Sequence, residues 1–484
     1  MTADRQGRRL GRRIAANSGW QIAGLLAGSA ISLATLVVVT RGLGPAGFGH
    51  LAAAIALLAI PVVLADSGLS LLVLREMSQD PSSTQSLVAV SMPLRLAVSA
   101  CAVALGVGAA YVIPLDGDTR RAVLIGSIGA FLTLIGLAFS TVLQAQLRIL
   151  WAVVGNVAGR VATLGLAAVA VAADGDVGDV MWAYVVGSAV TTAVIAVAVS
   201  RLVSLRPAVD IRRWKRMLID SVPLAAAQGF GQLYYRMDTV LLAALRSPRE
   251  VGAYAQAFKY VELTQVVASS VATSAFPPLA RFAAEGDPRF RPLMQRVFDA
   301  LLALSVPLSV LAAARAEDIV VAVGGEAFAD AAVALQILAA YPIASFLNAL
   351  IERAILIAGR DTLLAAWSAG FLVMNVAVNL ALIPVFGFPA AAAAALGTEV
   401  AGLVVGALIF RRLLGFLPRP DGVLPVAAGA AAMGAILAFA PGPAALVAAA
   451  SVLLYAAVAL AVPGSIRALA ADFLHGGRRV QAAS

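Results

Sequence analysis

Hydrophobic stretches long enough to cross a membrane recur along the whole chain, separated by short polar connections. A single helix needs about 20 mostly apolar residues to cross about 30 Å of hydrocarbon. Four such stretches fall in the first third of the sequence, at 22–40, 51–64, 97–113 and 122–143, and the last lies at 446–462. This pattern predicts a polytopic integral membrane protein.

The composition agrees with a membrane protein and argues against nucleic acid as a partner. Hydrophobic residues make up 61% of the chain and charged residues only 13%, whereas a soluble domain has about 25% charged residues. The net charge of +9 comes from basic residues at the ends of hydrophobic stretches. The single cysteine, Cys101, excludes a disulfide framework and a cysteine-based zinc site. The two histidines, His50 and His475, are too far apart in sequence to suggest a metal cluster.

Length and helix-breaking residues divide the chain into about fourteen transmembrane helices, so the expected fold class is all-α. The expected helices run at 17–40, 48–73, 87–113, 121–146, 151–173, 179–201, 218–245, 250–279, 293–314, 330–357, 361–385, 388–411, 423–440 and 444–466.

Arginine and lysine gather at one set of helix ends, and this sets the orientation because cytoplasmic loops carry the excess of basic residues. The N-terminus and the connection at 201–217 are rich in arginine, whereas Asp174, Asp176 and Asp179 lie in a connection on the opposite side. With fourteen spans, both termini lie on one side. We therefore expect a multi-pass protein of the cytoplasmic membrane with both termini in the cytoplasm.

The connections between helices are too short to fold as separate domains, and this limits the activity. The longest is the basic, amphipathic connection at 201–217. The chain lacks the GxxxxGK[ST] pattern of an ATP-binding loop, so no ATPase is expected within it. A membrane glycosyltransferase or polymerase usually carries a sizeable loop or an acidic motif, and neither is evident. The sequence therefore favours a transporter over an enzyme.

Two short segments in different halves of the chain resemble each other. Pro45 is followed four residues later by Gly49, and Pro248 by Gly252, and in both segments an alanine follows three residues after the glycine. Each segment follows the first helix of a predicted six-helix block. Proline closes the turn, and glycine lets the next helix start close to its neighbour. Repeated halves are the usual architecture of alternating-access transporters.

Four longer segments carry a resemblance to a known family. They are RGLGPAGFGHLA at 41–52, YYRMDTVLLAALRSPREVGAYAQAFKYVE at 234–262, LQILAAYPIASFLNALIERAILIAGRDTLL at 335–364 and NVAVNLALIPVFGFPAAAAAALGTEVAGLVV at 375–405. The first resembles the first extracytoplasmic turn of Wzx-type polysaccharide flippases. The second resembles their helices seven and eight, and the last two their helices ten to twelve. This family is part of the multidrug/oligosaccharidyl-lipid/polysaccharide exporter superfamily.

The resemblance implies two six-helix lobes around a central cavity, followed by two additional C-terminal helices. On this chain the lobes correspond to residues 1–201 and 218–412. A cytoplasmic basic linker at 202–217 joins them, and the extra helices and a cytoplasmic tail occupy 413–484. Members of the family move undecaprenyl-pyrophosphate-linked oligosaccharides from the inner to the outer leaflet, so the resemblance implies a lipid-linked glycan as the substrate.

Ionisable side chains within the expected spans mark the candidate site. Each costs about 2.5–3.5 kcal/mol at the centre of a helix and therefore usually faces a cavity or a partner. Gln228, Gln232 and Arg236 follow at four-residue spacing and share one helix face, and such a stripe lines water or a polar ligand more often than lipid. The ionisable residues are Asp66, Arg95, Arg160, Arg236, Asp238, Lys259, Glu262, Glu352, Arg353 and Glu399.

Two interpretations of these charges stay open. In the functional one, the cations form a vestibule for a pyrophosphate head group, since arginine matches phosphate oxygens with two parallel donors. In the structural one, Lys259 pairs with Glu262, Arg236 pairs with Asp66 or Glu399, and the other arginines reach the cytoplasmic surface along their own alkyl stems. The candidate head-group residues are Arg236, Lys259, Arg95, Arg160, Arg353, Gln228 and Gln232.

A second group of polar residues is a candidate sodium site. Asn375 and Asn379 lie one turn apart on the helix at 361–385, and Asp238 and Thr398 supply further oxygens. In the related lipid II flippases a sodium ion is held between the corresponding three helices, and oxygen ligands suit a hard cation. Here Asn379 stands where a second carboxylate would strengthen the site. Alternatively, the two asparagines only hydrogen-bond between packed helices.

The sequence thus predicts a flippase for a lipid-linked oligosaccharide or polysaccharide precursor, working by alternating access without covalent chemistry or a bound cofactor. The driving force stays open: a coupling ion, sodium or a proton, or the membrane potential. The alternative is a drug or cation antiporter of the same superfamily, which would be expected to carry a surplus of cavity carboxylates. A polytopic sugar polymerase or ligase is disfavoured by the short loops. Expected partners are the lipid-linked glycan, membrane lipid and polysaccharide assembly enzymes.

Overall fold

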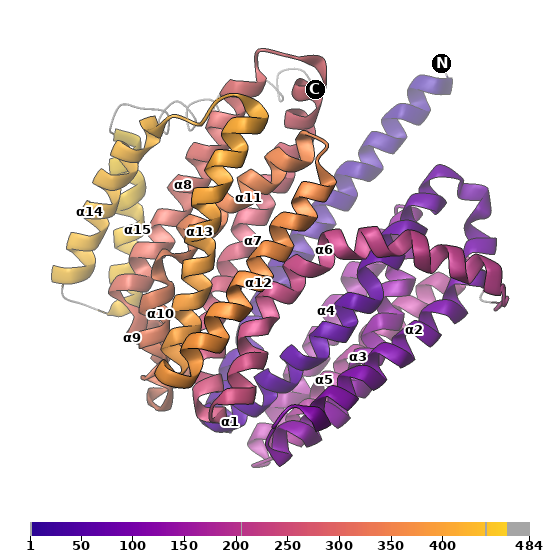
Figure 1. Ribbon diagram of the computed structural model, residues 1–484, viewed down its shortest axis with the longest axis horizontal. Coiled ribbons are helices and arrows are strands. Elements are labelled where there is room, and N and C mark those ends of the chain that lie inside the picture. Colours follow the sequence, from indigo (N-terminus) through magenta and orange to yellow (C-terminus); the bar gives the residue numbers. More distant parts are fainter. Residues whose placement is uncertain (1, 205, 441–442, 462–484) are drawn as a thin grey trace. The chain divides into compact units, whose positions relative to one another are not determined.

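The computed structural model describes residues 2–204, 206–440 and 443–461, and the regular secondary structure of these ranges is helical throughout. Packing within the chain divides it into two compact units, Met1–Gly252 and Ala253–Ser484. Each unit is a bundle of helices (Figure 1). The predicted all-α membrane fold is therefore confirmed, while the lobe boundaries expected from the sequence stay a prediction.

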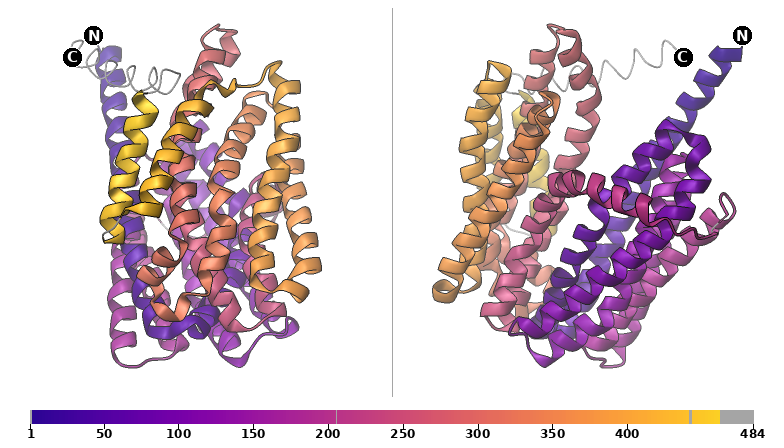
Figure 2. Two further views of the ribbon diagram at one scale, coloured as in Figure 1. Left: turned by 90° about the vertical axis from the view of Figure 1, so that its left-hand side faces the viewer. Right: turned by 45° about the vertical axis from the view of Figure 1, so that its right-hand side comes forward.

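Six helices lie wholly within the described part of the first unit, and α7 (Pro248–Glu285) begins there and continues into the second. Helices α3, α4 and α5 pack against one another and against α1, and α6 packs along α1 (Figures 1 and 2). A 3₁₀ turn, Pro81–Ser83, joins α1 to α2. The six helices are α1 (Thr2–Gln79), α2 (Thr84–Val112), α3 (Gly117–Ala145), α4 (Ile149–Ala172), α5 (Val177–Ser200) and α6 (Ile211–Leu245).

The second unit is built on α7 and the helices that follow it. Helices α7, α8, α11, α12 and α13 share one hydrophobic core, and α14 and α15 pack side by side against α8. Short 3₁₀ turns at Glu326–Phe328, Leu338–Ala340 and Pro420–Gly422 connect some of the helices. The described helices after α7 are α8 (Phe290–Ala314), α9 (Ala316–Gly324), α10 (Ala331–Ile337), α11 (Tyr341–Ile357), α12 (Asp361–Phe386), α13 (Phe388–Leu414), α14 (Val423–Phe439) and α15 (Ala444–Ala461).

The first two predicted spans, at 17–40 and 48–73, belong to the single long helix α1. Its apolar part, Gly19–Gln79, has 61 residues. As one straight helix this part would be about 90 Å long, or about three times the hydrocarbon thickness. The helix is interrupted at Gly44, where φ is 65°, and Pro45 follows directly. The interruption gives α1 two arms, each long enough to cross the membrane once.

The number of fourteen spans is not confirmed. Ten helices among the described residues are long and apolar enough to cross a membrane, and Leu446–Ala461 is a shorter apolar helix. Helices α6 and α7 match the spans predicted at 218–245 and 250–279 in position and are long enough, but they are more polar than the ten. The polar side chains that lower their hydrophobicity include several of the candidate site residues.

The two repeated segments of the sequence pack against each other, backbone against backbone. A Cβ atom on Gly49 would lie 1.8 Å from the carbonyl oxygen of Pro248, and one on Gly252 would lie 2.0 Å from the carbonyl oxygen of Pro45. The contact is reciprocal, since each glycine receives the proline carbonyl of the other segment. The resemblance between the segments therefore reflects one shared crossing, at which a side chain larger than hydrogen has no room.

Helices α4 and α5 also approach closely through glycine. A Cβ atom on Gly159 would lie 1.9 Å from Thr191 Oγ1, and one on Gly187 would lie 1.9 Å from Thr163 Oγ1. Helices in lipid associate through close packing and hydrogen bonds, because lipid tails are as apolar as leucine. Small residues at these positions therefore determine how tightly the α4–α5 pair forms.

Hydrogen bonds attach the basic connection after α5, and the start of α6, to α2. The side chain of Gln85 accepts from the backbone N–H of Ser204 at 2.9 Å and donates back to its carbonyl. The backbone N–H of Ala208 donates to the carbonyl of Ala89 at 2.9 Å. The indole of Trp214 donates to the carbonyl of Val90 at 2.9 Å. The helix expected to begin at 218 starts earlier, so the second half of the predicted linker is the first part of α6.

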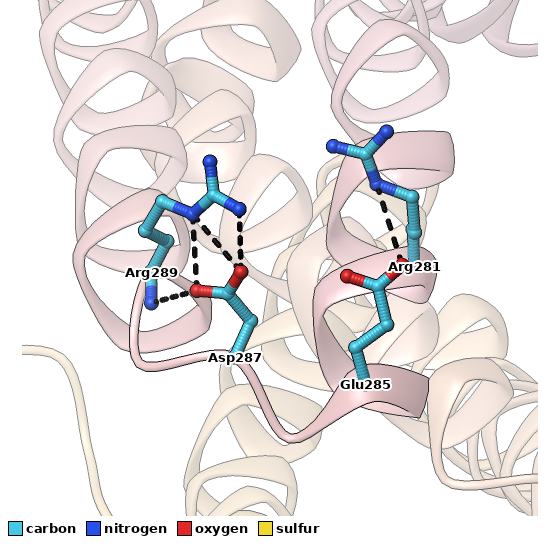
Figure 3. A network of polar contacts seen from close by, with 4 residues as sticks. All are labelled: Arg281, Glu285, Asp287 and Arg289. Carbon is cyan, nitrogen blue, oxygen red and sulfur yellow. Dashed lines mark hydrogen bonds and ion pairs between the residues drawn. The ribbon is translucent and has the colours of Figure 1, made fainter.

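Two ion pairs between arginine and acidic side chains lie at the connection between α7 and α8 (Figure 3). Arg289 donates from Nε and Nη2 to the carboxylate of Asp287, at 2.6 to 3.0 Å, and its backbone N–H donates to the same carboxylate. These bonds from Arg289 lower the pKa of Asp287 and keep it ionised. Arg281 and Glu285 form a second pair at 4.0 Å, and both arginines lie over the ring of Phe282. Such exposed pairs weaken as salt rises.

We expect Gly49→Ala and Gly252→Ala each to lower the thermal stability of the detergent-solubilised protein, because the added methyl group meets a backbone carbonyl that cannot move aside. Overpacking of this kind costs about 1–3 kcal/mol. The measurement is the unfolding temperature by intrinsic fluorescence.

The matched control is Gly165→Ala on α4, where an added Cβ atom has no neighbour within 4 Å. This change should be neutral or stabilising, since alanine favours a helix over glycine by about 1 kcal/mol. Equal behaviour of Gly49→Ala and Gly165→Ala would show that the crossing is not tight.

Candidate functional site

A partly buried cluster of charged and hydroxyl side chains joins three helices of the first unit. Arg95 Nη1 on α2 lies 3.6 Å from Asp66 Oδ1 on α1 and donates to Ser70 Oγ at 3.1 Å. Ser70 donates to Asp66 at 2.6 Å and lies 3.1 Å from the hydroxyl of Thr141 on α3. The sequence identified Asp66 and Arg95 but missed Ser70 and Thr141. Hydroxyl residues are common in membrane helices, and only packing reveals which of them meet a charge.

Arg95 lies well inside this unit and has a donor to spare. It stands eleven residues after the start of α2 at Thr84, about 17 Å along the helix, and is only 6% exposed. It therefore does not reach the surface along its alkyl stem. Its Nη2 atom is buried and has no hydrogen-bond partner among the residues that the structure describes. A buried guanidinium with an unused donor is well suited to receive an oxygen of an anion.

Arg160 on α4 contacts α1 instead. Its Nη1 donates to the carbonyl of Gly28 at 3.2 Å and to the hydroxyl of Ser32. The residue is exposed, so its remaining donors are accessible to water or to a ligand. Arg95 and Arg160 thus have different partners and different burial within the same unit.

The polar stripe predicted on the seventh span falls on α6. Arg236 is half-buried, Gln232 is exposed and Asp238 is buried at 2% exposure. Arg236 and Asp238 both interact with other residues. The side chain of Gln228 lies outside the described residues. Asp66 is one of the two partners that were proposed for Arg236 from the sequence. Among the described residues, Asp66 contacts Ser70 and Arg95.

The two candidate cations of the second unit have different surroundings. Lys259 Nζ donates to Glu262 Oε2 one turn along α7, as the three-residue spacing predicted. The guanidinium of Arg353 on α11 lies 5.8 Å from the ring centroid of Phe276 on α7. Its Nε atom is buried and has no hydrogen-bond partner in the described part of the chain. Lys259 is therefore paired within its own helix, while Arg353 keeps a buried donor.

A buried carboxylate lies between α11 and α13 in the second unit. Glu399 on α13 is 2% exposed and accepts from the hydroxyl of Tyr341 at 3.0 Å. Asn348 donates to the other carboxylate oxygen at 2.7 Å and to the backbone carbonyl of the same residue at 2.9 Å. The sequence singled out Glu399 but missed Tyr341. Tyr341 and Asn348 thus both donate to this buried carboxylate.

The four residues of the predicted sodium site come from both units. Asn375 and Asn379 on α12 are fully buried, and Asn379 Nδ2 donates to Asn375 Oδ1 at 3.0 Å. Thr398 on α13 is buried and donates to the carbonyl of Ala394, four residues earlier. Asp238 lies on α6 of the first unit. The structure thus supplies a hydrogen-bonded asparagine pair, and the ion site remains a prediction.

The ten ionisable residues that the sequence singled out within its spans divide unequally between the two units. The first unit holds three cations (Arg95, Arg160, Arg236) and two acids (Asp66, Asp238). The second holds two cations (Lys259, Arg353) and three acids (Glu262, Glu352, Glu399). A surplus of positive charge suits an anionic group, and a surplus of acids suits a cation. No cluster of three or more His, Cys, Asp and Glu side chains is found among the described residues.

Solved structures with this fold are membrane transporters. The fold matches the lipid II flippase MurJ in an inward closed conformation with a TM-score of 0.75 and 11% identity, covering 92% of this chain and 97% of that one. An inward-facing MATE multidrug transporter of the MOP superfamily gives 0.67 at 16% identity, over 80% and 94%. A MOP superfamily transporter from Pyrococcus furiosus Vc1 gives 0.58 at 15% identity, over 83% and 95%.

The sequence comparison identifies the family directly. Residues 14–283, more than half of the chain, match the family model described as "Polysaccharide biosynthesis protein". No curated protein matches the chain significantly. The resemblance to Wzx-type flippases agrees with the family match and with the MOP-type fold. This chain is therefore a multi-pass membrane protein that belongs to the polysaccharide biosynthesis protein family.

Proposed function

We propose that the protein is a flippase that moves a polyprenyl-pyrophosphate-linked oligosaccharide or polysaccharide precursor across the cytoplasmic membrane by alternating access. The family match over residues 14–283 carries this proposal. It links a helical membrane bundle to polysaccharide synthesis, and the fold is that of a lipid II flippase and of other transporters. The movement requires no covalent chemistry.

An anionic head group fits the first unit better than the second. Within its spans that unit carries the cationic surplus, and Arg95 there combines burial with an unused Nη2 donor. A pyrophosphate oxygen would take this donor and compete with Asp66 for the guanidinium. Arg236, Arg160 and Gln232 would add donors, and Lys259, Arg353 and Gln228 complete the proposed head-group set.

Two groups of buried polar residues are proposed for coupling to an ion. Sodium would be held by Asn375, Asn379 and Thr398 with Asp238, because oxygen ligands suit a hard cation. A proton would instead be carried by Glu399, whose carboxylate is buried and held by Tyr341 and Asn348. The two possibilities differ in whether removal of sodium stops transport.

The proposed setting is the cytoplasmic membrane, with both termini in the cytoplasm and membrane lipid around the bundle. Polysaccharide assembly enzymes would supply the lipid-linked glycan on one side and use it on the other. The bias of arginine toward the N-terminus and the α5–α6 connection supports this orientation.

A second candidate function is export of a cationic drug. The acidic surplus in the spans of the second unit, and the fold shared with MATE transporters, favour it. A cationic substrate would require carboxylates rather than arginines at the substrate site. Removal of Arg95 would therefore slow the flipping of a lipid-linked glycan but would not slow the export of a cationic drug.

Purified protein in liposomes is expected to move a fluorescent polyprenyl-pyrophosphate oligosaccharide between leaflets, and Arg95→Gln should reduce the rate at least about tenfold because a phosphate ligand is lost. Arg95→Lys should keep partial activity, since the charge remains while the planar fork is lost. Accessibility of the fluorophore to an impermeant quencher gives the rate. Export of a cationic dye without glycan movement would favour the second candidate function.

Thermal stability shows whether Arg95 binds the substrate head group or serves only as the structural partner of Asp66. Breaking a buried ion pair costs about 3–5 kcal/mol, so Arg95→Gln should also lower the unfolding temperature. In the double variant Asp66→Asn/Arg95→Gln, stability should return while flipping stays lost. Recovery of both would remove Arg95 from the head-group site. Arg121→Gln is the matched control, because Arg121 forms an exposed pair with Asp176 at 2.7 Å, and such pairs contribute about 0–1 kcal/mol.

Asp238→Asn is expected to leave the protein folded and to abolish the dependence of flipping on sodium, because a charged ligand of the ion is lost. Flipping is measured in liposomes with sodium or potassium as the salt. A well-folded variant whose transport depends on sodium as before would rule out the site. If the wild-type protein is insensitive to sodium but Glu399→Gln stops transport, a proton is the coupling ion.

The orientation is expected to place residues near Arg212 in the cytoplasm and residues near Asp176 outside. Single cysteines at these positions, in a background without Cys101, are treated with an impermeant thiol reagent on intact cells. Labelling should occur near Asp176 and should appear near Arg212 only after the membrane is opened. The reverse pattern would contradict the orientation.

A further inference from the structure

A cavity of about 530 Å³ opens between the start of α4 and the end of α5 in the first unit, and its lining does not include Asp66 or Arg95. Two arginines, Arg148 and Arg201, lie on its wall together with the indole of Trp151. The rest of the lining is apolar and includes Val194 and Val197. The cavity therefore combines a cationic part with an apolar wall that runs along the helices.

Helices α4 and α5 pack closely at Gly159 and Gly187, and Gly155 of α4 packs against Ile195 of α5. Trp151 lies one turn before Gly155, about 6 Å along α4, and lines the cavity. Alanines of α5 line the opposite wall and do not fill it. At the same end the chain turns through Leu147, which has a φ of 55° and places Arg148 at the start of α4.

The two cations of this cavity lack partners among the residues that the structure describes. Arg148 and Arg201 are both exposed, and neither guanidinium forms an ion pair or a hydrogen bond with a residue that the structure describes. This contrasts with Arg95, Arg160 and Arg121, whose guanidinium groups all contact side-chain oxygens of neighbouring residues. Both guanidinium groups therefore leave their donors available to an anion.

The chemistry of the lining selects an amphipathic anion. A free phosphate would use the arginines but would leave Val194 and Val197 without a contact, and Val197 is 54% exposed. Indole side chains favour the interface between head groups and hydrocarbon, and Trp151 is 44% exposed. Basic pockets between helices on the cytoplasmic side bind anionic lipid head groups. Both arginines lie at helix ends on the side that the charge bias assigns to the cytoplasm.

We propose that this cavity is a binding site for an anionic glycerophospholipid, with the lipid phosphate between Arg148 and Arg201 and an acyl chain along Val194 and Val197. The lipid phosphate would accept from donors that both guanidinium groups leave unused, and the acyl chain would cover the apolar wall. The site is separate from the proposed head-group residues and does not depend on the proposed function.

The test is binding of phosphatidylglycerol to the full-length protein in neutral detergent, followed by native mass spectrometry. One molecule is expected to bind more tightly than the rest, and phosphatidylcholine should not replace it. Arg148→Gln/Arg201→Gln should weaken this site at least about tenfold, because two charged donors to phosphate are lost. Arg148→Lys/Arg201→Lys should retain most of the binding, and the matched control Arg121→Gln should retain all of it.

Several results would overturn the proposal. They are an unchanged tight site in the double glutamine variant, equal binding of phosphatidylcholine, or equal binding of glycerol phosphate, which lacks acyl chains. Displacement of phosphatidylglycerol by a lower concentration of polyprenyl phosphate would assign the cavity to the carrier lipid instead. Since both arginines are exposed, the variants should fold, and gel filtration confirms this before the binding is compared.

Discussion

Helices of the first unit meet where glycine lets their backbones touch. Lipid tails are as apolar as leucine, so helices gain little by burying apolar side chains against each other, and close packing has to supply the association energy. At Gly49 and Gly252 each backbone receives a proline carbonyl from the other segment, and at Gly159 and Gly187 each helix receives a threonine hydroxyl. These contacts set the positions from which the polar side chains of the unit project.

Once the helices are in place, the low dielectric of the membrane decides how charges are arranged. A buried ion needs a partner or strong donors, because its desolvation is costly. Asp66 and Arg95 satisfy this need as a pair, with Ser70 between them. Glu399 satisfies it with the neutral donors Tyr341 and Asn348.

The candidate site could be predicted from sequence only in part. An arginine or acid inside an apolar helix stands out, so Arg95, Asp66 and Glu399 were identified. Pairs within one helix follow from spacing, and the predicted Lys259–Glu262 pair is present. Pairs between helices depend on rotation and depth, which local spacing does not contain. The partner of Asp66 is therefore Arg95, 29 residues away in sequence, and the hydroxyls around them gave no signal.

The sequence by itself determined that the chain is a helical membrane protein, because hydrocarbon admits only structures that satisfy their own backbone hydrogen bonds, and runs of apolar residues have the length of a span. It also marked the turn at Pro45 and the repeated glycines. Tertiary structure alone decided that Gly49 and Gly252 form one crossing, that the basic connection lies on α2, and that Arg148 and Arg201 share a cavity. These features join residues distant in sequence, and they depend on how neighbouring helices rotate and slide until their small residues meet.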